Sequence, residues 1–171
     1  GVFELDLFIP QNINYEFGEG IIRIFAELEN GQEAMGAEKI IVGGTNPSPT
    51  LDTVGPEIVL LFGNEYGENL EVFQGYNIKL LAKLRDESGI NISSNNIGQD
   101  ILLRINDNDP ISLNSFYFST GNTFRTGEIR VPIEGLVEGI NIISLEAWDN
   151  VGNSSILERE ILVNGSQSVK I

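Results

Sequence analysis

Three aspartates stand at turns where their carboxylates could act together on a cation. Asp86 follows a predicted second strand, Asp100 begins a third, and Asp149 follows a sixth. In an immunoglobulin-type sandwich these three strand ends lie at one pole. Ca²⁺ takes six to eight hard oxygen ligands, and carboxylates supply them well. The spacing therefore allows a Ca²⁺ site, with Asn91, Asn150 and backbone carbonyls as further ligands.

The same three aspartates also have a purely structural interpretation. An aspartate at a turn commonly accepts hydrogen bonds from the backbone N–H groups that follow it, and the chain has no regular Ca²⁺-loop motif. A further acidic stretch, residues 106–110, lacks the Gly and the later Glu of an EF-hand, and predicts a tight connection between strands. Turn capping and Ca²⁺ binding both stay open for Asp86, Asp100 and Asp149.

The composition excludes many other kinds of site. The 171 residues include no Cys and no His, so catalytic dyads and triads, thiolate or imidazole metal sites and disulfides are ruled out. Paired acids of the glycosidase type remain conceivable, but no cleft signal supports them, and we expect no enzymatic activity from this chain.

Acidic residues outnumber basic ones by 25 to 10, and the formal charge of −15 disfavours nucleic acid as a partner. No apolar run approaches the roughly 20 residues that a membrane span needs, so we expect no membrane insertion.

Alternating apolar and polar residues predict strands that are half buried. The alternation is strict at residues 3–7, every second residue is apolar at residues 78–85, and residues 127–133 alternate again. Gly, Asn, Asp and Pro clusters separate the alternating segments, and no amphipathic helix is apparent. Seven strands are expected after residue 56, over residues 57–62, 77–85, 100–106, 115–119, 127–133, 139–148 and 155–164. Seven short strands in about 110 residues predict an immunoglobulin-like antiparallel β-sandwich without a disulfide.

The first residues resemble part of a second copy of this module. Residues 26–44 align with residues 147–165 without a gap, as strand, turn, strand and a closing Gly. The identical pairs are Ala26 with Ala147, Gly31 with Gly152, Ile40 with Ile161, Val42 with Val163, and Gly44 with Gly165. A chance likeness of two hairpins is the alternative. We therefore predict an all-β chain, with a partial β-sandwich of three strands (1–46), a linker (47–55), the complete sandwich (56–165) and a tail (166–171).

Several phrases of the second module resemble a known family. They are Asp52–Ile58 (DTVGPEI), residues 86–91 (DESGIN), residues 96–101 (NIGQDI) and residues 147–155 (AWDNVGNSS). Together they are similar to the C-terminal region of type IX secretion sortases (PorU-type), which are gingipain-like cysteine peptidases of Bacteroidetes. Residues 3–44 resemble the segment just before that region. The family often has a His where this chain has Gln99, and its catalytic Cys and His have no counterpart here.

The resemblance implies a non-catalytic accessory region of a secreted or surface-exposed protein. Its place would be the outer-membrane surface or periplasm of a Gram-negative bacterium. Its partners would be the other domains of the parent protein and secretion-system or cargo proteins, with strand pairing through the incomplete N-terminal sheet. No cofactor is implied apart from the open question of Ca²⁺.

Two other functions compete with this interpretation. The aromatic residues at 116–118, together with Phe124, could form an exposed platform for carbohydrate or another adhesion partner. Alternation along a strand instead places some of these rings in the core, with Phe116 and Phe118 on one face and Tyr117 on the other. A Ca²⁺-stabilised extracellular spacer is the second competitor.

Overall fold

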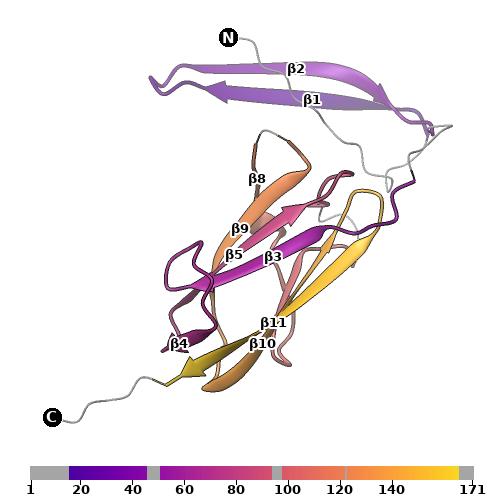
Figure 1. Ribbon diagram of the computed structural model, residues 1–171. Helices are drawn as coiled ribbons and strands as arrows, with labels where there is room; N and C mark the ends of the chain where they lie inside the picture. The colour runs from indigo at the N-terminus through magenta and orange to yellow at the C-terminus, as the bar shows by residue number, and fades with distance from the viewer. Residues whose placement is uncertain (1–15, 46–50, 94–97, 122, 166–171) are drawn as a thin grey trace. The chain divides into compact units, whose positions relative to one another are not determined.

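The computed structural model describes residues 16–45, 51–93, 98–121 and 123–165 (Figure 1). The described residues fall into two compact units, one ending at Leu51 and the other starting at Asp52. Both units consist of strands, and no α-helix occurs in the described ranges. The predicted strand at residues 3–7, the start of the predicted linker and the tail lie outside these ranges. None of the described helical segments has the length and hydropathy that a membrane crossing needs.

The first unit is an antiparallel hairpin. Strands β1 (Gly18–Glu27) and β2 (Glu33–Val42) pair along their whole length, from Gly18 opposite Val42 to Glu27 opposite Glu33. The hairpin turns around Gly31, whose φ of 79° suits glycine, and its two strands carry apolar residues on both faces. The sequence predicted both strands.

The second unit contains two sheets. The first has the order β3 (Glu57–Gly63), β5 (Ile78–Arg85), β9 (Thr126–Ile133) and β8 (Tyr117–Ser119). The second has the order β4 (Val72–Gln74), β11 (Ser154–Asn164), β10 (Gly139–Trp148), β6 (Leu102–Ile105) and β7 (Ile111–Ser112). All pairs are antiparallel except β4 with β11. The predicted all-β sandwich class is confirmed, and the strand order is compatible with an immunoglobulin-type sandwich.

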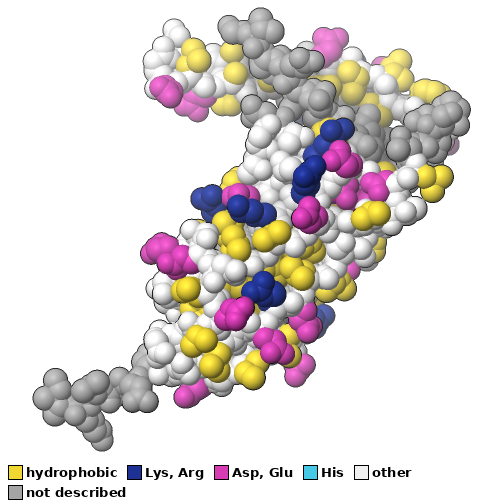
Figure 2. Space-filling view, in the orientation of Figure 1, with side chains coloured by type: hydrophobic (Ala, Val, Ile, Leu, Met, Phe, Trp, Pro, Cys, Tyr) yellow, Lys and Arg dark blue, Asp and Glu magenta, His cyan; other side chains and the backbone are white. Residues whose placement is uncertain are grey.

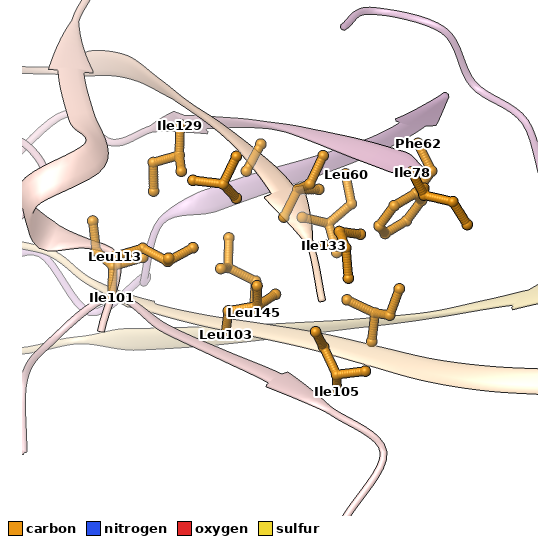
Figure 3. Close-up of a cluster of buried hydrophobic side chains, with 14 of the residues drawn as sticks. Leu60, Phe62, Ile78, Ile101, Leu103, Ile105, Leu113, Ile129, Ile133 and Leu145 are labelled. Atoms are coloured by element: carbon orange, nitrogen blue, oxygen red, sulfur yellow. The ribbon is translucent and has the colours of Figure 1, made fainter. Parts of the chain in front are cut away.

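One hydrophobic core lies between the two sheets (Figure 3). Alternate residues of β5 and β9 face alternate residues of β6 and β10, as period-two patterns require. The fully buried side chains include Phe62, Leu80, Ile129, Ile143 and Leu145. Because no disulfide crosses the sheets, burial of these side chains holds the sandwich together.

The structure differs from the sequence-based expectation in three elements. The short strands β4 and β7 were not expected, because two or three residues carry no periodic signal. Residues Asn114–Phe116 form a 3₁₀ turn, so the strand expected from residue 115 starts only at Tyr117.

Pro132 lies where β9 has no neighbour on the β8 side in the described ranges, since β8 pairs only with residues 127–129. The missing N–H of proline therefore breaks no ladder there.

Candidate functional site

Three aspartates converge at one pole of the sandwich. The antiparallel pairing of β3 with β5 places the start of one strand beside the end of the other, and this brings Asp52 near Asp86. An isolated bridge between Ile90 and Asp149 joins the segment after β5 to the end of β10. One carboxylate oxygen from each of the three aspartates lies within 4.8 Å of the others. Asp86 and Asp149 are buried, and Asp52 is half-buried.

Asp149 organises the turn between β10 and β11. Its Oδ1 accepts hydrogen bonds from the backbone N–H groups of Val151, Gly152 and Asn153, at 2.9, 2.6 and 2.7 Å. Its Oδ2 accepts a bond from the side-chain amide of Asn153 at 2.7 Å. Four donors from its own turn are the geometry expected of a capping aspartate.

Ser88 links the other two aspartates. Its backbone N–H donates to Oδ1 of Asp86 at 2.7 Å, and its hydroxyl donates to Oδ2 of Asp52. The backbone N–H of Val54 donates to Oδ1 of Asp52 at 3.1 Å. Ser88 thus donates one hydrogen bond to each of these two aspartates, and Val54 donates a further one to Asp52.

The charges at this pole are not balanced by a nearby cation. No Lys or Arg of the described ranges forms an ion pair with Asp52, Asp86 or Asp149. Burial raises the pKa of Asp86 to about 6, and the negative charges of Asp149 and Asp52 add to the rise. The hydrogen bond from Ser88 instead lowers the pKa of Asp52. The cluster can relieve its repulsion by holding a proton on Asp86 or by binding a cation.

Asp100 is not a member of this cluster. Its Oδ1 accepts a hydrogen bond from the side-chain amide of Asn114 at 2.8 Å, and Oδ1 of Asn114 accepts one from the backbone N–H of Ile101 at 2.7 Å. Of the three aspartates named from the sequence, the structure brings Asp86 and Asp149 together and places Asp100 outside the group, with Asp52 as the third acid. Whether Ca²⁺ binds stays a prediction.

Asp52 was missed because it lies five residues before β3, in a stretch without strand periodicity. The signal that could have found it is topological. In an antiparallel pair the residues before the first strand lie beside those after the second, so an acid before β3 is a neighbour of Asp86.

Hydrogen bonds join the turns at this pole. The side-chain amide of Asn153 donates to the carbonyl of Asp52 at 3.1 Å, and that of Asn150 donates to the carbonyl of Ser88 at 3.0 Å. Gly89 has a φ of 84°, and a Cβ there would meet the Phe124 ring and the Asn150 amide. Hydrogen bonds and close packing between these turns therefore fix their relative positions.

The aromatic stretch divides between core and surface. Tyr117 packs against the hydrophobic core, whereas Phe116 and Phe118 are 51% and 43% exposed. The Arg130 guanidinium lies 5.5 Å from the centre of the Phe118 ring, a cation–π distance. Alternation along β8 thus places Tyr117 inward and Phe118 outward, and Phe116 is exposed at the end of the 3₁₀ turn.

No family model and no curated protein matches the chain. Among solved structures, the chain is similar to dimeric latent PorU from Porphyromonas gingivalis, with 27% sequence identity and a TM-score of 0.60. The match covers 91% of this chain but 15% of that PorU chain. The fold is therefore PorU-like, and the likeness concerns a small part of PorU.

Proposed function

We propose that the chain is a non-catalytic accessory β-sandwich region of a type IX secretion sortase-like protein. The parent would be a gingipain-like peptidase, secreted or held at the outer-membrane surface of a Gram-negative bacterium. The region would space the peptidase domain and offer a docking surface to other domains of the parent and to secretion-system or cargo proteins.

The observation that carries this proposal is where the family-like phrases lie. Three of them hold the cluster aspartates, in DTVGPEI, DESGIN and AWDNVGNSS. The fourth joins the same pole through Gln99, whose Oε1 accepts a hydrogen bond from the Asn91 amide at 3.2 Å. Phrases that are far apart in sequence thus lie together at one pole of the sandwich. Such proximity is expected if the four phrases belong to one structural unit. The likeness to part of PorU supports the same assignment.

The surface is suited to contacts with partner proteins. Figure 2 shows acidic, basic and hydrophobic side chains interleaved over the visible face of the sandwich. The net charge of −15 favours basic partner surfaces and disfavours acidic ones. Salt should accordingly weaken any docking that depends on this charge.

The proposal is tested in the full-length parent protein. Deleting residues 56–165 should leave cleavage of a short synthetic peptide intact while slowing the removal of cargo sorting domains in cells. A second variant, with several exposed acids changed to amides, guards against misfolding of the deletion. Unchanged cargo processing in both variants would contradict the proposal, as would a parent gene without a peptidase domain.

A carbohydrate-binding or adhesion module is a competing function, favoured by the exposed rings of Phe116 and Phe118. Stacking of sugars on such rings should be lost in the variant Phe118→Ala. A glycan array probed with this variant and the unchanged protein decides between the functions, because binding that depends on Phe118 would favour carbohydrate recognition.

A Ca²⁺-stabilised spacer is the other competing function, favoured by the three uncompensated carboxylates. Ca²⁺ at a concentration 100-fold above its dissociation constant would add about 2.7 kcal/mol to the free energy of unfolding. Thermal unfolding with Ca²⁺ or with a chelator measures this effect. The variant Asp86→Asn should abolish it, and Asp107→Asn, at an exposed acid in the β6–β7 loop, should not.

A further inference from the structure

The hairpin of the first unit repeats the hairpin β10–β11 residue by residue. Adding 121 to the residue numbers of β1 gives the bounds of β10, and adding 121 to those of β2 gives residues 154–163 of β11. The pairing register is the same, since Gly18 opposite Val42 corresponds to Gly139 opposite Val163.

The two turns are built alike as well. The N–H of Leu28 donates to the carbonyl of Gln32 at 2.8 Å, as the N–H of Asp149 donates to that of Asn153 at 2.9 Å. The equivalent glycines 31 and 152 both have positive φ, at 79° and 99°. The matching strand bounds, pairing register and turn geometry argue against a chance likeness of the two hairpins. Each face of the first hairpin can therefore be compared with the equivalent face of β10–β11.

One face of β10–β11 is a core face. Its members Ile143, Leu145, Ala147, Ile161 and Val163 are all at most 2% exposed. The equivalent face of the first hairpin, here called the core-equivalent face, consists of small and apolar residues apart from Glu38. Its large or apolar members are Ile22, Ile24, Ala26, Ala34, Ile40 and Val42.

The core-equivalent face is not buried like its counterpart. Ile24 is 38% exposed, whereas its equivalent Leu145 is completely buried. Ile40 is half-buried, whereas its equivalent Ile161 is buried. The opposite face carries five charged residues, at positions 19, 23, 27, 33 and 39, together with the exposed apolar side chains of Ile21, Phe25, Met35 and Ile41. The core-equivalent face has Glu38 as its single charge and is the face that the repeat equates with a buried core face, and such a face needs a covering layer.

We propose that the core-equivalent face is the inner surface of a first β-sandwich, and that the chain segment preceding Gly1 in the parent protein supplies its covering sheet. In the second module the strands that cover β10–β11 begin at Glu57, 82 residues before Gly139. The same spacing places the start of the first module about 65 residues ahead of Gly1. A parent as long as the similar PorU chain, of which the match spans 15%, has room for this segment.

The sequence ahead of β1 continues the repeat. In sequence, Asp6, Leu7, Ile9 and Pro10 correspond in type to Glu128, Ile129, Val131 and Pro132, which belong to the strand preceding β10, whereas Phe8 stands in place of Arg130. The spacing of the two prolines is 122 residues, so the connection to the hairpin differs by one residue. This match favours the preceding chain over a second copy of the hairpin as the source of the missing layer.

The one charge on the core-equivalent face gives the proposal a second consequence. Glu38 takes the place of Arg159, whose guanidinium lies 3.6 Å from the carboxylate of Glu71 just before β4. Because the sign is reversed, the residue equivalent to Glu71 should be Lys or Arg. The repeat spacing places it about 50 residues ahead of Gly1.

Hydrogen exchange of the full-length parent tests the proposal with two neighbouring isoleucines. Ile40 lies on the core-equivalent face and Ile41 on the opposite face of the same strand. Ile40→Glu should speed exchange of the peptides covering β1 and β2 by at least about tenfold, because it buries a charge. Ile41→Glu, the matched control, should leave exchange within about twofold.

Three results would overturn the proposal. One is an equal effect of the two variants. Another is a preceding segment without alternating strands and without a basic residue at the expected place. The third is self-association of the 171-residue chain through this face that persists in the full-length parent, which would make a second copy the occupant.

Discussion

Asp86 has a raised pKa because it is buried beside two other carboxylates. Its folded pKa of about 6 exceeds the value of 3.8 for an unperturbed aspartate, so the folded state binds the proton more tightly than the unfolded state. The contribution of this group to stability is therefore fully present below the unfolded pKa. It is lost as the pH rises from about 3.8 to about 6.

Asp86→Asn should stabilise the sandwich at pH 7 in the presence of a chelator. The amide retains an oxygen for the Ser88 N–H and carries no charge, so the free energy of unfolding should rise by roughly 1–3 kcal/mol. Denaturant unfolding at pH 7 and at pH 3.5 measures the effect, which should nearly vanish at the lower pH. Asp107→Asn is the control, and a loss of stability at pH 7 would contradict the assignment.

Asn141 is a completely buried polar residue that ties two loops together. Its Oδ1 accepts from the N–H of Val137 at 2.9 Å and from the amide of Asn106 at 3.0 Å. Its Nδ2 donates to the carbonyls of Val137 and Gly139, at 2.7 and 3.1 Å. All hydrogen-bonding capacity of the side chain is therefore used.

Asn141→Ala should destabilise the sandwich by roughly 2–4 kcal/mol, because it leaves several buried polar groups without a partner. Chemical denaturation of the purified chain measures the loss. The exposed residue Asn64 provides the control, since Asn64→Ala should change the free energy of unfolding by less than about 0.5 kcal/mol. A loss below about 1 kcal/mol at Asn141 would show that water replaces its bonds.

At the scale of elements, β8 and β9 are held together by an aromatic ring over a glycine. A Cβ on Gly127 would meet the ring of Tyr117, so the two strands can pack closely only with glycine there. The Tyr117 hydroxyl is buried and has no hydrogen-bond partner in the described ranges, and burial raises its pKa to about 12. The ring contributes packing, whereas the hydroxyl forms no hydrogen bond in the described ranges.

Gly127→Ala should lower the free energy of unfolding by about 1–3 kcal/mol, since the ring must leave its position. Tyr117→Phe should leave stability unchanged or raise it by up to about 1 kcal/mol. Thermal unfolding monitored by circular dichroism compares both with Gly36→Ala, where a Cβ meets no atom within 4 Å. A destabilising Tyr117→Phe would reveal a partner for the hydroxyl.

Elements with a long periodic pattern were predictable, and those without one were not. The alternation at residues 78–85 and 127–133 determined β5 and β9, and the match of residues 26–44 to residues 147–165 anticipated the equivalent hairpins. The short β4 depends on its parallel contact with β11, from Leu162 opposite Val72 onward, and no local pattern signals that contact. Likewise, the 3₁₀ turn before Tyr117 replaced part of a strand that the aromatic content had favoured.

At the scale of the whole molecule, the net charge of −15 opposes compaction. The six ion pairs in the described ranges involve mostly exposed side chains, which contribute little each. Self-repulsion of the acidic surface should therefore outweigh these attractions at low ionic strength.

Raising NaCl from about 10 mM to about 0.3 M should increase the melting temperature at pH 7 by a few degrees, because salt screens the repulsion. The measurement is made with a chelator present, so that divalent ions do not contribute. Potassium glutamate in place of NaCl separates screening from specific chloride binding. A melting temperature that falls with salt would show that the ion pairs dominate.

Composition and period-two patterning alone determined the all-β fold class, seven of the nine strands of the second unit and the absence of Cys- and His-dependent chemistry, because these follow from residue types and local spacing. The tertiary structure decided the rest. It replaced Asp100 with Asp52 in the acidic cluster, turned Tyr117 inward and Phe118 outward, and showed that the two hairpins share one register. Such facts depend on which strand ends meet across a sheet, and contacts between residues far apart in sequence leave no local trace.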